Sequence, residues 1–505
     1  MIAQKYDKHD MMQSEFEERA RRILPHGLGL SVDVYQPVLI DLMRALREAD
    51  LAPAFLEVFK ASTSALRSVR SRFPDVPLAY HGEGLWVTQP DFLDSASGRL
   101  GVSEACTHLM VLRSAWLNHE CATKQMGGYS FGTYLPPLYT ESAARMTSDN
   151  LRVLQSRLDQ AADAEHAAPP LLLLEMPPLT YFGCGTMPIP DFFRVVTERA
   201  ACGLVLDIGH LWTVYRYTGA WREQSLQSFA DMFMRTFPME RVIEIHVAGL
   251  APHSEDTCHR NDYEPPRWID AHGAAIPEAL FDLLRLVLRN SRLSSLKGIA
   301  LEVDTKPIPD VVSEFRRFTT EFAGEKLRWT SAGAENATQS ARRSGVSQRV
   351  APEPVGNDER RMLGALYRRY AEFVQAGGHD AQDVSLAVLG GGEDEDEDSV
   401  RPYRQTYLPY EVIHWGGDVA DMFPETCARL CEAGIDLRDF VAFWFGAPRI
   451  QNDLYDFFLL KIERFVEFVA HRTPSLSATA RSEADELRRD YHLANEALPV
   501  QEARA

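Results

Sequence analysis

The chain has 505 residues, of which 45% are hydrophobic and 25% charged, and a formal net charge of −19 at pH 7. This composition is ordinary for a globular protein with a sizeable core, and the length allows two or more domains. The negative charge argues against a general nucleic-acid binder and against docking on an anionic membrane, since both need a basic surface. The sequence has no apolar run long enough to span a membrane, no apolar signal region, and seven scattered cysteines. We therefore expect a cytoplasmic protein with reduced thiols.

Eight apolar runs occupy the first 305 residues, and almost all of them end in a His, Asp or Glu side chain. The runs are GLGLSV at 27–32, APAFLEV with Glu57, PLAYH with His81, CTHLMVL with His108, PLLLLE with Glu175, GLVLDIGH with Asp207 and His210, VIEIH with His246, and GIALEVD with Glu302 and Asp304. Helical patterns lie between most of them, which indicates βαβ units and a parallel sheet. Eight such units predict a closed (β/α)₈ TIM barrel, whose active site lies at the C-terminal ends of the strands.

A change of composition divides the chain. We assign residues 1–325 to a metal-dependent catalytic barrel. Residues 326–359 are rich in Ser, Ala, Gly, Arg and Pro without an apolar period, which predicts a linker. Residues 360–491 carry apolar side chains at three- and four-residue steps, which predicts a second, mostly α-helical domain before a tail over 492–505. Inside that domain, GGGEDEDED at 390–398 predicts a flexible acidic loop.

The polar residues at the ends of the runs predict a metal centre. A carboxylate at the end of a buried strand, such as Glu175, is costly unless it is paired or bound to a metal. The candidate ligands are His81, His108, Glu175, Asp207, His210, His246, Asp270, His272 and Glu302, with Asp304 in reserve. One zinc ion needs only three or four protein ligands, so this set predicts at least two ions. Imidazole and carboxylate together suit iron, manganese or zinc, and at this point both redox iron and hydrolytic zinc chemistry stay open.

These motifs, in this order, resemble those of the multinuclear non-haem iron-dependent oxidative enzymes, TIM-barrel proteins that modify ribosomally made peptides, often at cysteine. The matching segments are GLGL near Gly27, FLEV at 55–58, HGEGL at 81–85, THL at 107–109, the LPPLYTESAARM segment from Leu135, LLLLEMP at 171–177, GLVLDIGH at 203–210, IEIHVAG at 243–249, DAHG at 270–273 and LEVD at 301–304. The resemblance covers roughly residues 27–318. Each motif is weak alone, and their order and spacing are specific.

The resemblance implies a ligand set. The family's motif histidines fall on His81, His108, His246 and His272, and its acidic positions on Glu175, Asp207, Asp270, Glu302 and Asp304. Three positions depart from its pattern, since Thr107 replaces an aspartate, Met176 an asparagine, and His210 the asparagine of D-x-x-N. We expect Glu175, His246 and Asp270 to carry catalysis, and Glu244 and His119 to support the site rather than bind metal. The resemblance also implies two or three iron ions, with O₂ as co-substrate.

The expected function is iron- and O₂-dependent oxidative modification of a precursor peptide at cysteine, in natural-product biosynthesis. D-x-x-H also occurs in xylose-isomerase-like and endonuclease IV-like barrels, so a metal-dependent hydrolase or isomerase is the alternative, and a non-catalytic metal-dependent scaffold is a third.

In the family a separate partner protein commonly recognises the peptide, and here the helical domain is a candidate replacement. Its aromatic residues are either a peptide groove or an ordinary core. They are Tyr403, Tyr407, Tyr410, Trp415, Phe443, Trp444 and Phe445.

Overall fold

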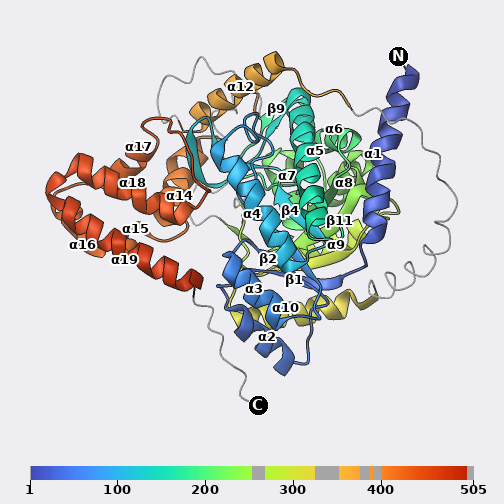
Figure 1. Ribbon diagram of the computed structural model, residues 1–505, viewed down its shortest axis with the longest axis horizontal. Helices are drawn as coiled ribbons and strands as arrows, with labels where there is room; N and C mark the ends of the chain where they lie inside the picture. Colours follow the sequence, from blue (N-terminus) through green and yellow to red (C-terminus); the bar gives the residue numbers. More distant parts are fainter. Residues whose placement is uncertain (1, 253–267, 325–351, 376–386, 390–399, 497–505) are drawn as a thin grey trace.

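The computed structural model describes residues 2–252, 268–324, 352–375, 387–389 and 400–496 (Figure 1). Eight parallel strands close into a barrel in the order β1-β14-β11-β10-β8-β4-β3-β2, which confirms the predicted TIM-barrel fold. The strands are β1 (Gly27–Val32), β2 (Leu56–Phe59), β3 (Leu78–His81), β4 (Trp116–Glu120), β8 (Leu171–Glu175), β10 (Gly203–Asp207), β11 (Val242–Val247) and β14 (Gly298–Glu302).

Helices surround the barrel, as Figure 1 shows. They are α2 (Leu39–Glu48), α3 (Thr63–Arg72), α4 (Ala96–Leu112), α5 (Glu141–Ala164), α6 (Ile189–Arg199), α7 (Ile208–Tyr217), α8 (Leu226–Thr236), α9 (Glu278–Leu288) and α10 (Ile308–Glu321), with short 3₁₀ turns η1 (Ala220–Arg222) and η2 (Met239–Arg241). Ser62, Ser95 and Thr140 begin α3, α4 and α5, because each side-chain oxygen accepts a hydrogen bond from the backbone amide three residues further on.

One predicted strand is wrong. The run CTHLMVL, which contains His108, forms the last two turns of α4, and the fourth barrel strand is β4, with the sequence WLNHE. An apolar run of this length cannot be assigned to a strand or to a buried helix by periodicity alone. The strand itself escaped notice because Asn118 and Glu120, two of its inward side chains, are polar and point toward the centre described below.

The lower half of the barrel interior is apolar. Trp116, Leu173 and Val205 pack there in one buried cluster with Phe16 and Ile23 from the N-terminal segment that begins with α1 (Ile2–Arg22). Most polar inward side chains therefore lie in the strands' upper halves, at the C-terminal mouth, and Glu244, which pairs with Val205 and bonds to Trp116, lies below them.

Short β pairs extend from the mouth. A hairpin of β5 (Thr123–Met126) and β6 (Tyr129–Leu135) follows β4, β7 (Leu138–Tyr139) pairs with β9 (Cys184–Gly185), and β12 (Leu250–Pro252) pairs with β13 (Trp268–Asp270) after β11. Gly127 and Gly128 make the hairpin turn with positive φ angles, which glycine adopts at no steric cost. The β12–β13 pair carries Asp270 back over the barrel.

The second region is mostly helical, as predicted (orange to red in Figure 1). It contains α12 (Asn357–Gln375), the π-helix η4 (Tyr403–Tyr407), α14 (Leu408–His414), α15 (Val419–Met422), α16 (Pro424–Glu432), α17 (Leu437–Trp444), α18 (Phe457–Arg472), η5 (Pro474–Leu476) and α19 (Ser477–Glu496). Most of its aromatic residues form a core, and Tyr410 and Trp415 are each 49% exposed. No helix in the described part of the chain is long and apolar enough to cross a membrane.

The predicted boundaries differ from the observed elements at two points. Helix α12 starts at Asn357, inside the predicted linker, and the Val355 amide donates to the Asp149 carboxylate of α5 over 2.6 Å. Helix α19 runs to Glu496, inside the predicted tail, where the Asn495 side chain accepts a hydrogen bond from Tyr35 over 2.9 Å. Residues 326–351 of the predicted linker and the acidic loop at 390–398 lie outside the described residues. The division into independent domains stays a prediction.

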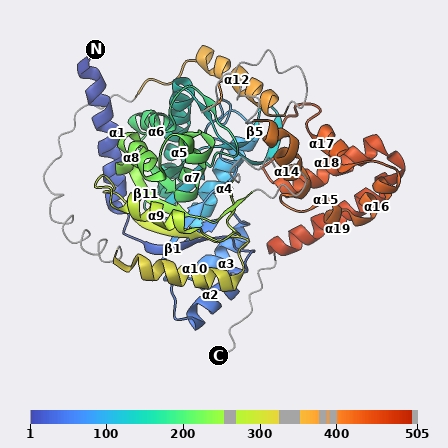
Figure 2. The same ribbon diagram turned by 180° about the vertical axis from the view of Figure 1, so that it is seen from behind.

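The helical region docks on the β5–β6 hairpin, and Figure 2 shows it beside the barrel from behind. The Trp444 indole donates to the Ser130 carbonyl over 2.8 Å, and the Tyr455 hydroxyl donates to the Phe131 carbonyl over 2.7 Å. The hairpin thus joins the helical region to the strand that carries Glu120.

Candidate metal centre

The C-terminal ends of six strands bring polar side chains into the barrel mouth. Side chains alternate between the two faces of a strand, so every second residue points inward. Glu120 pairs with Glu175, and Asp207 pairs with His246, so neighbouring strands present these side chains at matching levels. All four are buried. His81 on β3 and Glu302 on β14 are buried as well, and the buried Glu57 on β2 lies against His246.

Glu175 lies at the middle of this set. Its Oε1 is 3.2 Å from His246 Nδ1, and its Oε2 is 3.3 Å from His81 Nε2. The Asn118 amide also donates to Oε2 over 2.6 Å. The two oxygens of one carboxylate therefore face histidines that come from different strands, which is the arrangement expected of a ligand shared between two metal ions.

Four histidines around this centre each have one ring nitrogen committed to a neighbour. His81 Nδ1 donates to the Gly82 carbonyl over 3.2 Å, and His210 Nδ1 donates to the Met176 carbonyl over 2.6 Å. His246 Nε2 lies 3.0 Å from Glu57 Oε2, and His272 Nδ1 contacts the Asp304 carboxylate. The other nitrogen of each ring faces carboxylates of the centre, and metal-binding histidines are held in this way.

The side toward β13 is built around Asp270. Its Oδ2 lies 3.4 Å from His210 Nε2 and 3.1 Å from His272 Nε2. Asp207 contributes differently, since its Oδ1 accepts the His210 backbone amide over 2.6 Å and so caps α7. This cap explains the spacing of D-x-x-H, because it fixes His210 one turn into the helix, beside the carboxylate that caps it.

Unpartnered buried oxygens show that the residues fit a cation. Glu120, Asp207, Asp270 and Glu302 each have one buried carboxylate oxygen with no hydrogen-bond partner among the described residues. Buried charges of this kind are costly unless they are paired or bind a metal ion. Two groups of ligand atoms, each within 4.8 Å of one another, share Glu175. They are Glu175, Asp207, His246 and Glu302, and His81, Glu120 and Glu175. The geometry therefore fits two or more ions.

The charges of the centre shift the pKa values of its members. Burial alone would lower the pKa of His81, but Glu175 and Glu57 raise it to about 9. Burial raises the pKa of Asp207 to about 7, against the opposing charge of His210. In the metal-free protein His81 therefore keeps its proton at neutral pH, whereas Asp207 titrates near neutrality. Metal binding would displace the protons, because a ligand binds in its deprotonated form.

His108 is not brought to the centre. It follows Thr107 on α4, its Nδ1 pairs with the Tyr80 hydroxyl over 2.8 Å, and its Nε2 pairs with the Thr63 hydroxyl over 3.1 Å. Tyr80 precedes His81 on β3, and adjacent strand residues point to opposite faces, so His108 packs outside the barrel. Both of its nitrogens are occupied by hydroxyls. The sequence match that placed a ligand here is therefore wrong, because it fell on a helix.

His119 and Glu244 were expected to support the site. The Leu85 amide donates to His119 Nε2 over 3.0 Å, and His119 Nδ1 donates to the Glu120 carbonyl over 2.7 Å. Both ring nitrogens are thus occupied by the backbone. Glu244 accepts the Trp116 indole N–H over 2.7 Å, and one of its oxygens lies 3.6 Å from His246 Nε2.

Sequence reasoning missed three residues of the centre. Glu57 lies within the FLEV run and was noted near the end of a predicted strand but not as part of the site. Asn118 and Glu120 belong to the strand that was missed. The sequence did hold a signal for this strand. Asn118 and Glu120 are two residues apart, so on a strand both polar side chains point to the same face.

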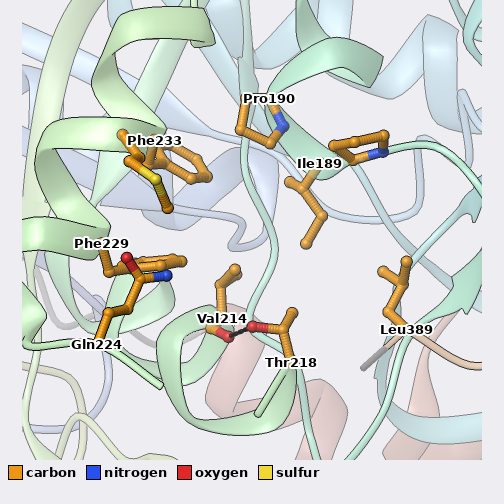
Figure 3. Close-up of a pocket in the computed structure, with 10 residues that line it drawn as sticks. Ile189, Pro190, Val214, Thr218, Gln224, Phe229, Phe233 and Leu389 are labelled. Carbon is orange, nitrogen blue, oxygen red and sulfur yellow. Dashed lines mark hydrogen bonds between the residues drawn. The ribbon is translucent and has the colours of Figure 1, made fainter. Parts of the chain in front are cut away.

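A separate apolar pocket of about 280 Å³ lies between α6, α7 and α8. Figure 3 shows Ile189, Phe229, Phe233 and Leu389 around it, beside the hydrogen bond from Thr218 to the Val214 carbonyl. Its lining has no acidic, histidine or cysteine side chain, so it is not part of the metal centre.

A family model for the "RiPP precursor modification enzyme MbnB/TglH/ChrH" matches residues 26–321, more than half of the chain. The chain belongs to this family. Membership confirms the resemblance drawn from the motifs and makes the protein an enzyme of the class that modifies ribosomally made precursor peptides. The match ends before the helical region, which lies outside the part that defines the family.

The chain is similar to several UPF0276 proteins. A UPF0276 protein of Anaeromyxobacter sp. is 27% identical over 304 residues, covering 59% of this chain and 92% of that protein. A UPF0276 protein of Paraburkholderia phytofirmans is 26% identical over 228 residues, covering 44% of this chain and 62% of that protein.

Among solved structures, endonuclease IV of Thermus thermophilus matches at 14% identity with a TM-score of 0.35, covering 58% of this chain and 99% of that one. A D-tagatose 3-epimerase-like protein matches at 15% identity with a TM-score of 0.34, covering 59% and 99%.

Proposed function

We propose that this protein is an iron- and O₂-dependent oxidase that modifies a ribosomally made precursor peptide at cysteine. One observation carries the proposal. In a barrel of a peptide-modifying family, four histidines each direct one ring nitrogen toward a centre that contains a shared, buried Glu175. A mixed imidazole–carboxylate set without thiolate suits iron.

The proposed ligands are the histidines and carboxylates of the centre. They are His81, Glu120, Glu175, Asp207, His210, His246, Asp270, His272 and Glu302. Iron bound there would supply Lewis acidity and redox chemistry with O₂. Of the residues first expected to carry catalysis, Glu175 and His246 hold the buried part of the centre, and Asp270 lies where the centre approaches solvent.

The protein's own groups orient these ligands and control access. Glu57 fixes the ring of His246, and the Met176 carbonyl fixes the ring of His210, so each histidine offers a defined nitrogen. Exposure rises from 0% for the His246 side chain to 20% for His272 and 35% for Asp304. We infer that the peptide enters from the exposed His272–Asp304 side and reaches inward toward His81 and Glu120, while the apolar lower barrel excludes water from the opposite side.

We also propose that the helical region presents the peptide, in place of a separate recognition protein. Tyr410 and Trp415 are the aromatic side chains exposed enough to meet a peptide directly. Tyr403, Tyr407, Trp444 and Phe445 are buried and therefore serve as core. Placing both functions on one chain raises the effective concentration of the peptide at the barrel.

Metal analysis and peptide turnover test the proposal. Protein purified without oxygen is expected to contain at least two irons per chain. A cysteine-containing precursor peptide encoded beside the gene is expected to change mass when air is admitted, and not under nitrogen. The Cys→Ser peptide serves as control. Turnover of a sugar or phosphoester by zinc-loaded protein, with no iron-dependent change in the peptide, would favour the hydrolase or isomerase alternative instead.

A further inference from the structure

The β5–β6 hairpin carries a buried phenol, Tyr134, whose hydroxyl has no hydrogen-bond partner in the described part of the chain and which the charges of Glu120 and Glu175 reach. Tyr134 lies at the base of the hairpin, next to Leu135, which pairs with Thr123 at the start of β5. Thr123 follows Glu120 by only three residues, so the base of the hairpin lies directly beside the end of β4. The hairpin therefore places Tyr134 near the Glu120 side of the centre.

Neighbouring side chains hold the Tyr134 ring in place. The Lys124 ammonium lies 4.4 Å from the ring centroid, and the Trp86 ring packs against it at 6.4 Å. Lys124 is paired with Glu83 over 2.6 Å. Trp86 is fixed by its hydrogen bond to Gln125 over 3.0 Å. A tyrosine with these contacts has little rotational freedom, so the direction of its hydroxyl is set before any ligand binds.

The Tyr134 hydroxyl is buried and has no hydrogen-bond partner among the described residues. Buried tyrosine hydroxyls are nearly always hydrogen-bonded, so an unpartnered one calls for an explanation. Burial raises the pKa of Tyr134, and the charges of Glu83, Glu120 and Glu175 raise it further. The phenol is therefore a neutral donor at physiological pH, beside the carboxylates of the centre.

We propose that Tyr134 donates a hydrogen bond to the anionic or carbonyl group of the substrate that binds at the His81–Glu120–Glu175 side of the centre. The inference rests on the proposed function and adds a substrate-contacting residue to it. The ionised carboxylates accept hydrogen bonds but cannot donate them, and the Asn118 amide already donates to Glu175, so the phenol adds a further donor to this part of the site. A hydrogen bond to an ionised acceptor is about twice as strong as one between neutral groups.

Azide binding to the ferric protein tests the proposed hydrogen bond from Tyr134 without the natural peptide. Azide is a small anion that accepts hydrogen bonds, and its charge-transfer absorption reports binding at open iron positions. The variant Tyr134→Phe removes only the hydroxyl. We expect it to weaken azide binding by about tenfold, equivalent to about 1.4 kcal/mol. Its iron content is expected to equal that of the wild type.

Tyr129→Phe is the matched control, because it makes the same change on the same hairpin, at a ring that packs toward Phe445 instead. The azide affinity of Tyr129→Phe should equal that of the wild type.

Thermal unfolding separates a binding role of the Tyr134 hydroxyl from a structural one. Removing an unpartnered buried hydroxyl should leave the melting temperature of Tyr134→Phe unchanged or higher, whereas loss of a structural hydrogen bond would lower it.

Equal azide affinity of iron-loaded wild type and Tyr134→Phe would overturn this inference and leave the proposed function standing. A variant that loses iron, or that melts at a lower temperature, would also overturn it, since the hydroxyl would then have a structural role. A wild-type protein that holds no iron would overturn the proposed function, and this inference with it.

Discussion

The Glu175 carboxylate contacts a histidine on each side, 3.2 Å from His246 and 3.3 Å from His81. Replacing it by glutamine keeps the shape and the hydrogen-bonding capacity of the side chain but removes its charge. We expect Glu175→Gln to lose at least one of the bound ions, with the barrel still folded, because the strands are held by packing and the ligands lie at the rim. Metal analysis and circular dichroism measure the two effects separately.

His108→Gln is the informative companion to that variant. The structure gives His108 two hydroxyl partners on the outside of the barrel, whereas its motif had suggested a ligand. Metal content equal to that of the wild type is expected. Loss of metal from His108→Gln, with Glu175→Gln unaffected, would contradict the site described here.

The Glu57 carboxylate leads to a second prediction about a single residue, which concerns metal affinity. Its carboxylate accepts a hydrogen bond from Ser31 over 2.9 Å and lies 3.0 Å from His246 Nε2. Glu57→Gln should weaken metal binding by about 10- to 100-fold, as is typical when the partner of a metal-bound histidine is changed. Competition with a chelator of known affinity measures the change. An unaltered affinity would show that Glu57 does not tune His246.

The buried Glu411 carboxyl leads us to expect that the stability of the folded protein depends on pH. Burial raises its pKa to about 8, from an ordinary 4.5, although Tyr403 and the Gly132 amide donate to it. Because the folded protein holds a proton that the unfolded chain releases over this range, stability should fall as pH rises, by up to about 1.4 kcal/mol per pH unit. The stabilising contribution is fully present below about pH 4.5 and is lost as pH rises through 8.

Melting temperatures between pH 6 and pH 8 test this, with Glu411→Gln as the comparison. Glutamine keeps an acceptor oxygen for Tyr403 but does not titrate. The variant should therefore show a flatter dependence on pH, whatever its absolute stability. Equal slopes in both proteins would locate the titrating group elsewhere.

At the scale of elements, seven of the eight barrel strands follow from apolar runs, and all of these except β1 carry an acidic or histidine side chain near their C-terminal end. The exception is β4, which a search for apolar runs misses because some of its inward side chains are polar. Its inward residues Asn118 and Glu120 serve the metal centre, so a strand that contributes strongly to the site looks least like a buried strand. Conversely, the run with His108 looks like a strand because that face of α4 is buried against the barrel. The contacts of the ring nitrogens, which only the structure gives, separate the proposed ligand histidines from His108 and His119.

The docking of the helical region was not predictable from sequence. Trp444 and Tyr455 bond to backbone carbonyls of the β5–β6 hairpin, and a backbone carbonyl has no sequence signature. Periodicity gave the helices themselves, because apolar spacing depends on local geometry. It could not say which surface the helices cover.

At the scale of the whole molecule, the predicted linker and the observed docking together predict how the chain responds to a protease. Limited proteolysis should cut first within residues 326–351, where the composition predicts a linker. The two fragments should nevertheless stay together under native conditions, since the helical region contacts the hairpin through buried aromatic side chains. Denaturing electrophoresis detects the cut, and size-exclusion chromatography of the same sample detects the association. Separate elution of the barrel fragment would show that the two regions are independent.

The uneven exposure of the centre has a consequence for the rate at which ions bound there would exchange. His246 and Glu175 are sealed inside the barrel, whereas His272 and Asp304 border solvent. A chelator added to the loaded protein should therefore remove metal in two kinetic phases, a fast one from the Asp270–His272 end and a slow one limited by opening of the barrel mouth. Time-resolved metal release measures both phases, and a single exponential would show that the ions leave as one unit. Two phases would mean that the outer ion can be replaced by another metal while the inner one stays in place.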